Sequence, residues 1–247
     1  MGVRLKVCVN VKSLQLFIEK SPFYKTLKEK LNTENKLSLS DVSLDITTLL
    51  ITLIKQITQR NVIVVNPNLY QAQKMYDRLN RVTENARFFP QDEFITTEML
   101  AMSEELKFER LNTIRNIIQE NEHIVITHPT GFVKKMLPLS YYKQAIHHYK
   151  VGDTVDFNTL IETFVKYGYQ RTVTVENVGE FAVRGSILDV FITEYDRPIR
   201  IDFFDTDIDS MRYFDINTQR SIEKLNEFTL TPRSEFFYDK ETKQRIV

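Results

Sequence analysis

The chain has 247 residues, and its 33 Lys and Arg are balanced by 33 Asp and Glu. Without a net positive charge, nothing attracts the whole chain to nucleic acid or to an anionic membrane, so such contacts need a local patch. The single cysteine, Cys8, excludes an internal disulfide framework. The longest apolar run, at 47–54, is far shorter than the roughly 20 residues of a membrane-spanning helix. We expect a globular cytoplasmic protein of two domains with no membrane partner.

The first half of the chain alternates helix and strand patterns. Apolar residues at spacings of three and four predict amphipathic helices over 46–57, 69–79 and 104–118. The β-branched run VIVV at 62–65 predicts a strand buried on both faces, and HIVIT at 123–127 predicts a second strand. Strands separated by helices are typical of a doubly wound α/β layer with a parallel sheet.

The second half has a different pattern. Asp156 as N-cap and Gly168 as the left-handed terminal residue predict a helix between them. After this helix, short strands are predicted in two antiparallel hairpins, with turns near 177–179 and 205–207. Residues 135–233 therefore form a predicted α+β domain, and residues 234–247 are expected to begin a further element.

Residues 40–47, SDVSLDIT, precede a helix at the spacing of a phosphate-binding loop. Such a loop needs glycines, a lysine and a hydroxyl that holds magnesium. This chain offers Ser40, Asp45, Ile46 and Thr47, and a carboxylate at the helix start repels phosphate. The sequence predicts a degenerate loop that binds no nucleotide or other cofactor, with Ser43 or Asp45 capping the helix.

The sequence predicts no metal site and no catalytic residue. Asp205, Asp207 and Asp209 alternate as in a calcium loop, but Ser210 and Ile216 stand where Gly and Glu are required. The adjacent His147 and His148 lack further ligands at metal-binding spacing. No Ser, His and Asp set with a motif is present either.

Two long motifs carry a resemblance to a known family. Residues 179–191, GEFAVRGSILDVF, and the segment from PIRID to SIEKL at 198–225 closely resemble the UvrB-like module at the N-terminus of bacterial transcription-repair coupling factor, Mfd. NLYQAQKMYDRL, SEELKFERLNTI and PTGFVKKMLP follow the family's order in the first half. The resemblance covers residues 14–240, and the first dozen residues match nothing in the family.

This resemblance implies a fold for each part of the chain. Residues 1–134 are expected to form a degenerate P-loop, helicase-like α/β domain similar to UvrB domain 1a, without its nucleotide-binding motifs. Residues 135–233 are expected to form an α+β domain with antiparallel hairpins, similar to UvrB domain 2. Residues 234–247 would then begin a further UvrB-like segment that is truncated here.

The resemblance also implies a function that involves no catalysis in this chain. The family module recruits the excision-repair protein UvrA to stalled transcription complexes in transcription-coupled nucleotide excision repair. In this family, later domains of a longer protein bind ATP, magnesium, RNA polymerase and DNA. The C-terminal region of that protein also contacts this module. UvrB's damage-probing hairpin is shortened here and lacks its tyrosines, so Phe88, Phe89 and Phe94 are expected to be core or loop residues.

The family's arginine-rich UvrA-docking surface carries over onto Arg171 and Arg184. Arg184 should point outward by strand alternation, although it could instead pair with Asp189. Arg171 could instead complement the dipole at the end of the preceding helix. Ala182 stands where UvrB has a further arginine. Weaker candidates for the same surface are Phe181, Glu180 and Tyr169, and Phe181 by default belongs to the core.

Two other functions stay open at this point. One is a weak ATPase with an unorthodox loop. The other is a DNA-binding module related to UvrB that uses Lys134, Lys135 and nearby basic residues, with an affinity that falls steeply with salt.

Overall fold

A computed structural model describes residues 19–92 and 104–237, which cluster into two compact units that divide between Lys134 and Lys135. Cys8, Phe94 and residues 238–247 of the predicted further segment lie outside the described residues.

The first unit is built on a three-stranded parallel sheet with the order β1-β3-β2. Its strands are β1 (Val62–Val65), β2 (Ala86–Phe88) and β3 (Ile124–Thr127). The parallel register aligns Val62 and Ala86 with Ile124, so β3 is the central strand. The α/β class with a parallel sheet is therefore confirmed, although the short strand β2 was not predicted.

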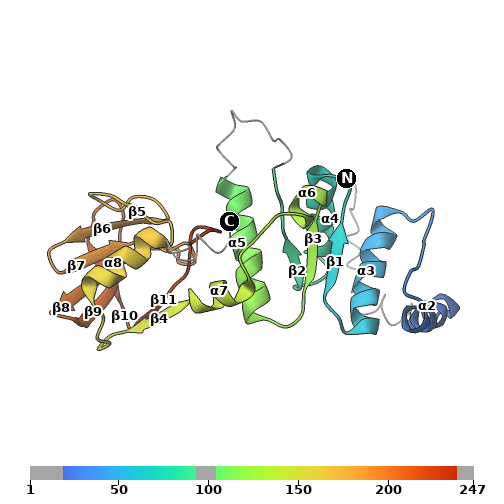
Figure 1. The fold of residues 1–247 in the computed structure, drawn as a ribbon, viewed down its shortest axis with the longest axis horizontal. Coiled ribbons are helices and arrows are strands. Elements are labelled where there is room, and N and C mark those ends of the chain that lie inside the picture. The colour runs from blue at the N-terminus through green and yellow to red at the C-terminus, as the bar shows by residue number, and fades with distance from the viewer. Residues whose placement is uncertain (1–18, 93–103, 238–247) are drawn as a thin grey trace, which may run out of the picture. The chain divides into compact units, whose positions relative to one another are not determined.

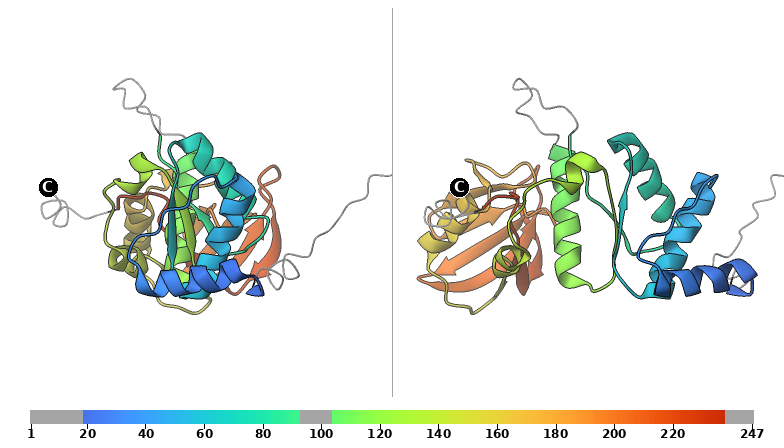
Figure 2. Two further views of the ribbon diagram at one scale, coloured as in Figure 1. Left: turned by 90° about the vertical axis from the view of Figure 1, so that its right-hand side faces the viewer. Right: turned by 45° about the vertical axis from the view of Figure 1, so that its right-hand side comes forward.

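Helices cover both faces of this sheet (Figure 1). On one face lie α3 (Leu44–Thr58) and α4 (Leu69–Leu79), and on the other lies α5 (Glu104–Gln119). Figure 2 shows α2 (Pro22–Thr33) packed beside α3, away from the sheet. The short helix α6 (Pro129–Phe132) follows β3 directly.

The core of this unit lies between the sheet and the two helices on one face. It contains Ile51 of α3, Ala72, Met75 and Leu79 of α4, and buried side chains of β2 and β3. The prediction that 62–65 is buried on both faces is wrong, because Ile63 and Val65 are exposed. β1 is an edge strand, and alternation turns Ile63 and Val65 away from the core that Val62 and Val64 contact.

The second unit contains a six-stranded sheet with the order β10-β9-β8-β7-β6-β5. The strands are β5 (Gln170–Arg171), β6 (Glu180–Arg184), β7 (Ile187–Val190), β8 (Ile199–Phe204), β9 (Asp207–Phe214) and β10 (Ser221–Leu225). A two-stranded antiparallel ribbon joins β4 (His147–Lys150) to β11 (Glu227–Leu230). Two helices, α7 (Leu139–Gln144) and α8 (Phe157–Lys166), complete the unit, and the antiparallel pairs confirm its predicted mixture of helix and hairpins.

The hairpins are only partly where the sequence predicted them. The turn at Asp205, with φ of 57°, joins β8 to β9 as predicted. The predicted hairpin around 177–179 is wrong, since β5 pairs with β6 in parallel and β6 turns back at Gly185 to pair with β7. The strands β10 and β11 were not predicted.

The helix α8 lies across one face of the six-stranded sheet (Figure 1). Asp156 caps it by accepting a hydrogen bond of 2.7 Å from Thr159 N–H, and Phe164 stacks on Phe181 of β6 with ring centroids 5.4 Å apart. On the opposite face, Val175, Ala182, Phe191 and Phe214 form a small buried cluster. Beyond that cluster, the face opposite α8 carries polar and exposed side chains.

Candidate functional site

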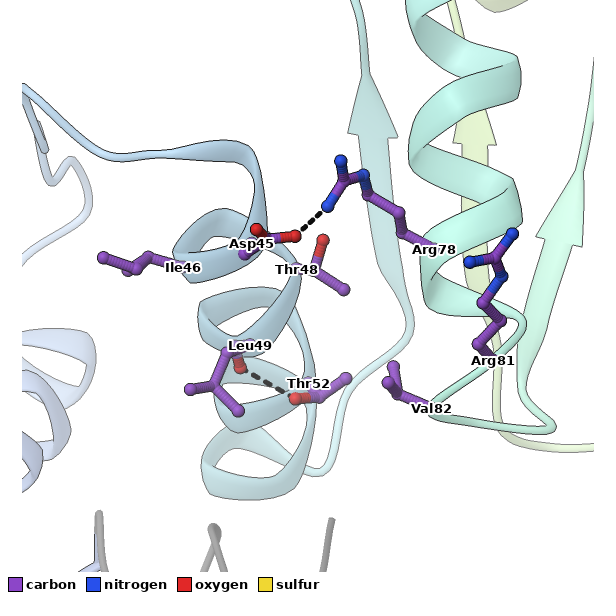
Figure 3. Close-up of a pocket in the computed structure, with 8 residues that line it drawn as sticks. All are labelled: Asp45, Ile46, Thr48, Leu49, Thr52, Arg78, Arg81 and Val82. Atoms are coloured by element: carbon purple, nitrogen blue, oxygen red, sulfur yellow. Dashed lines mark hydrogen bonds and ion pairs between the residues drawn. The ribbon is translucent and has the colours of Figure 1, made fainter. Parts of the chain in front are cut away.

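The residues at phosphate-loop spacing are engaged in ordinary helix contacts. Ser43 is the N-cap of α3 and accepts a hydrogen bond from Ile46 N–H, while the Thr47 hydroxyl donates to Ser43 O at 2.9 Å. The Asp45 carboxylate pairs with Arg78 of α4 (Figure 3). Of the two predicted caps, Ser43 is therefore the one used, and Asp45 places a negative charge where a phosphate would bind.

A pocket of about 470 Å³ lies beside this ion pair, between α3 and α4. Ile46, Leu49 and Val82 supply aliphatic surface, and Arg78 and Arg81 border it (Figure 3). Since Asp45 already neutralises Arg78, the charge here differs from that of a triphosphate cradle, which gathers a lysine and backbone N–H groups. Among residues 19–92 and 104–237, no three His, Cys, Asp or Glu side chains gather as they would around a metal ion.

The second unit contains a denser set of charged side chains, on the sheet face opposite α8. Asp189 of β7 is buried and accepts two hydrogen bonds from Arg200 of β8, at 2.7 and 2.9 Å. Arg184 approaches the same carboxylate, with 3.7 Å between Nη2 and Oδ2. The predicted pairing of Arg184 with Asp189 is therefore present, but Arg200 is the closer partner. These bonds raise the pKa of Arg200 against the opposing effect of burial.

A second ion pair extends this row across the sheet. Arg212 of β9 donates to Asp202 of β8 at 2.7 Å and to the Ser210 hydroxyl at 2.8 Å. The register explains the arrangement, because Ala182, Asp189, Arg200 and Arg212 are successive cross-strand partners. Side chains at paired positions lie on the same face of a sheet.

Two of the arginines are the most exposed charged side chains of this group. The side chains of Arg184 and Arg212 are 48% and 40% exposed, whereas Asp189 and Asp202 are 2% and 23% exposed. A partner that approaches this face of the sheet therefore contacts the guanidinium groups of Arg184 and Arg212 before the carboxylates. Because each guanidinium is a rigid fork of donors, it matches a carboxylate in two places at once.

Two apolar side chains border the same arginines. Phe204, at the end of β8, is 77% exposed, and Ile187 at the start of β7 is half-buried. Phe203 packs edge-on against Phe157 of α8, so alternation turns Phe204 to the opposite face. We define the open face as the surface of Arg184, Ile187, Asp202, Phe204 and Arg212.

The structure does not bring the two predicted arginines together. Arg171 of β5 is the cross-strand partner of Phe181 of β6, and the Phe181 ring stacks on Phe164 of α8. Arg184 lies three residues further along β6, and alternation places it on the other face. Arg171 is exposed at the sheet edge and, within the part of the chain that the structure describes, makes no ion pair.

Two of the weaker candidates are core residues. Phe181 is fully buried against Phe164, and Tyr169 is only 4% exposed. The Tyr169 hydroxyl donates to Thr231 O at 3.0 Å. Neither side chain is available to a partner on the surface of this unit, because the aromatic layer under α8 contains both.

Glu180 holds the loop before β6 together. Its carboxylate accepts hydrogen bonds from Glu176 N–H at 2.8 Å, from Asn177 N–H at 2.9 Å and from the Asn177 side chain at 3.0 Å. Burial alone would raise the pKa of Glu180, but these bonds and the charge of Arg233 outweigh it and lower the pKa. The Glu180 carboxylate is therefore already hydrogen-bonded within its own loop.

Four residues of this face were not predicted from the sequence to be functional: Arg200, Asp202, Phe204 and Arg212. Their signal is the alternation in IRIDFF at 199–204, where every second residue is apolar and the others are charged or exposed. Such alternation predicts a strand with one polar face. Which strands neighbour it, and so which charges meet, depends on the sheet order.

The region that contains the six-stranded sheet also matches a known protein family. Residues 148–236 match the family described as the UvrB interaction domain. The transcription-repair-coupling factor of Bacillus subtilis is 31% identical over 239 residues, which is 95% of this chain and 20% of that protein. Those of Staphylococcus epidermidis and Staphylococcus aureus are each 31% identical, over 76% and 74% of this chain and 16% of each relative.

This chain therefore spans about one fifth of the length of the Bacillus subtilis relative. None of the described helices is long and apolar enough to cross a membrane. Residues 148–236, which include every strand of the six-stranded sheet, are thus similar to the UvrB interaction domain, within a chain that resembles a segment of transcription-repair-coupling factor over nearly its whole length.

Proposed function

We propose that this chain is a non-catalytic recruitment module that binds UvrA in transcription-coupled nucleotide excision repair. The match of residues 148–236 to the UvrB interaction domain supports a role in protein docking, and the name of the relatives supports the pathway. In this proposal the chain works in the cytoplasm as the N-terminal, UvrB-like part of a longer protein.

The observation that carries the proposal is the outward placement of arginines over buried acids. Asp189 is 2% exposed in its side chain and fixes Arg200, while Arg184 remains 48% exposed above it. An arginine held on a rigid strand loses little freedom on binding, and in the centre of an interface it is worth about 2 kcal/mol or more. We assign Arg184 as the main docking residue.

The other predicted docking residues take different roles. Arg171 is exposed on β5 and would contact UvrA only if the partner reaches around the sheet edge. Glu180 is committed to hydrogen bonds with its own loop, and Phe181 and Tyr169 are buried. We therefore propose that these three shape the domain from within.

We also propose that this part of the protein has no nucleotide chemistry of its own. Asp45 pairs with Arg78 and Thr47 donates to the helix backbone, so neither is available to phosphate or magnesium. ATP, magnesium, RNA polymerase and DNA would then be bound by later domains of the longer protein, and its C-terminal region would contact this module.

Capture of purified UvrA tests the docking site. We expect Arg184→Glu to reduce capture by about tenfold or more, since a reversed charge would face the partner's acids. Arg171→Glu should have a smaller effect. The matched control is Arg197→Glu, because Arg197 is 53% exposed and forms its own ion pair with Glu223.

Each variant must first show an unchanged circular dichroism spectrum and melting temperature. Equal capture by the unmodified chain, Arg184→Glu and Arg171→Glu would contradict the site assignment. Failure of the unmodified chain to capture UvrA would contradict the proposed function itself.

A further inference from the structure

We infer that the docking surface extends from Arg184 over the whole open face to Arg212, with Phe204 as its apolar anchor. This inference rests on the proposed function and deepens it, because it states what the partner must present. The matching surface on the partner is an apolar pocket bordered by carboxylates.

Phe204 is placed as an interface anchor would be. It is 77% exposed at the end of β8, although its neighbour Phe203 is nearly buried. A one-residue irregularity between Asp202 and Phe203 interrupts the pairing of β8 with β9 at this position, and Asp205 then turns the chain with φ of 57°. The tight turn fixes the backbone beside Phe204, so the ring costs little conformational entropy when a partner covers it.

The turn between β6 and β7 brings Arg184 to the same end of the sheet. Arg184 is paired with Ile187, Ile187 is paired with Asp202, and Phe203 N–H donates to Ser186 O at 2.9 Å. Phe204 therefore lies two strands away from Arg184. Neighbouring strands are about 4.8 Å apart, so both side chains fit within one interface.

Arg212 supplies the second cation of the surface. It is paired with Arg200 across the strands, and its guanidinium bonds to Asp202 and to Ser210. These two contacts fix its orientation, and 40% of its side chain remains exposed. Arg184 on β6 and Arg212 on β9 thus present oriented donors from the strands on either side of Ile187 and Asp202.

The charges on the open face indicate which side chains to expect on the partner. The charged side chains of this face include three arginines, Arg184, Arg200 and Arg212, and two aspartates, Asp189 and Asp202. Of these, Arg184 and Arg212 are the most exposed and Asp189 is the most buried. The two most exposed charges of this set are thus both positive, which favours carboxylates on the partner. An exposed aromatic ring on the same sheet face as exposed arginines is typical of a protein interface, where aromatic residues and arginine are enriched.

Binding of purified UvrA, measured by interferometry, tests the anchor. We expect Phe204→Ala to weaken binding by about tenfold or more, and Arg212→Gln by about threefold or more. Phe204 is exposed, so its removal should leave the melting temperature unchanged. Phe132→Ala in the first unit is the matched control, because Phe132 is 59% exposed and loses the same atoms.

Arg184→Glu, measured alongside, separates this inference from the proposed function. If Arg184→Glu weakens binding and Phe204→Ala binds as tightly as the unmodified chain, the anchor is wrong and the proposed function stands. If neither variant weakens binding, both are wrong. An effect of Phe204→Ala that Phe132→Ala reproduces would also overturn the anchor, as would a loss of affinity for a DNA duplex with no change in UvrA binding.

Discussion

Asp189 is the residue on which the charged face of the second unit depends. Its carboxylate is buried, bonds twice to Arg200 and lies within 3.7 Å of Arg184. A buried acid is tolerated only when it is paired and hydrogen-bonded, and Asp189 meets both conditions. The pair therefore contributes specificity, since it fixes where both arginines lie, more than net stability.

We predict that Asp189→Ala destabilises the chain by about 3 kcal/mol, because it leaves Arg200 partly buried without its partner. Urea denaturation followed by circular dichroism measures the change in free energy of unfolding. The control is Glu227→Gln, which breaks the exposed ion pair with Lys150 at 3.3 Å and should cost about 1 kcal/mol or less. Equal losses in the two variants would show that Asp189 is no more than a surface acid.

Among the elements, α8 determines which face of the six-stranded sheet is closed. It packs Phe164 on Phe181 and Phe157 on Phe203, and Gly168 ends it with φ of 88°. Gly168 lies close to Ser234, since an added Cβ would be 2.9 Å from the Ser234 Cβ. The turn after α8 is thus closed by the chain segment that follows β11.

We predict that Gly168→Ala lowers stability more than Gly152→Ala does. Both glycines have φ near 90°, where an L-residue costs about 1–2 kcal/mol. Only Gly168 has another segment within contact distance, so only this variant adds a steric cost. Thermal unfolding of the two variants compares them, and equal melting temperatures would show that the contact with Ser234 relaxes without cost.

Local patterns predicted the helices better than the strand pairing. The caps Ser43 and Asp156 and the terminal Gly168 act within one turn of the chain, so neighbouring residues specify them. The segment 177–179 was predicted to be a hairpin turn because Asn177 and Gly179 are typical turn residues, and Gly179 does have a positive φ of 85°. A turn residue, however, does not determine which strands pair with each other. In the structure, β5 pairs in parallel with β6.

At the scale of the whole molecule, the chain divides into two compact units with different surfaces. The first has helices on both faces of a parallel sheet, and its α3 begins with an acid in an ion pair. The second presents the open face. Docking by the open face can therefore be tested separately from nucleotide binding by the first unit.

We predict that the chain shows no binding of ATP with magnesium at micromolar concentrations in calorimetry. Phosphate would have to displace Arg78 from Asp45, and magnesium would have to recover the Thr47 hydroxyl from the helix backbone. Binding that Thr47→Ala or Asp45→Arg abolishes would contradict this. Thr33→Ala is the control, because Thr33 makes the same hydroxyl bond to the backbone in α2, at 3.0 Å.

The sequence by itself determined the α/β and antiparallel patterns, the helix ends, the loss of phosphate-loop residues and the family resemblance. These properties depend on residue identity and short spacing. Only the tertiary structure decided that Phe181 and Tyr169 are buried, that Arg171 and Arg184 lie on opposite faces, and that Arg184, Phe204 and Arg212 share one surface. The physical reason is that a strand's alternation defines two faces, whereas the packing of α8 chooses which one is covered.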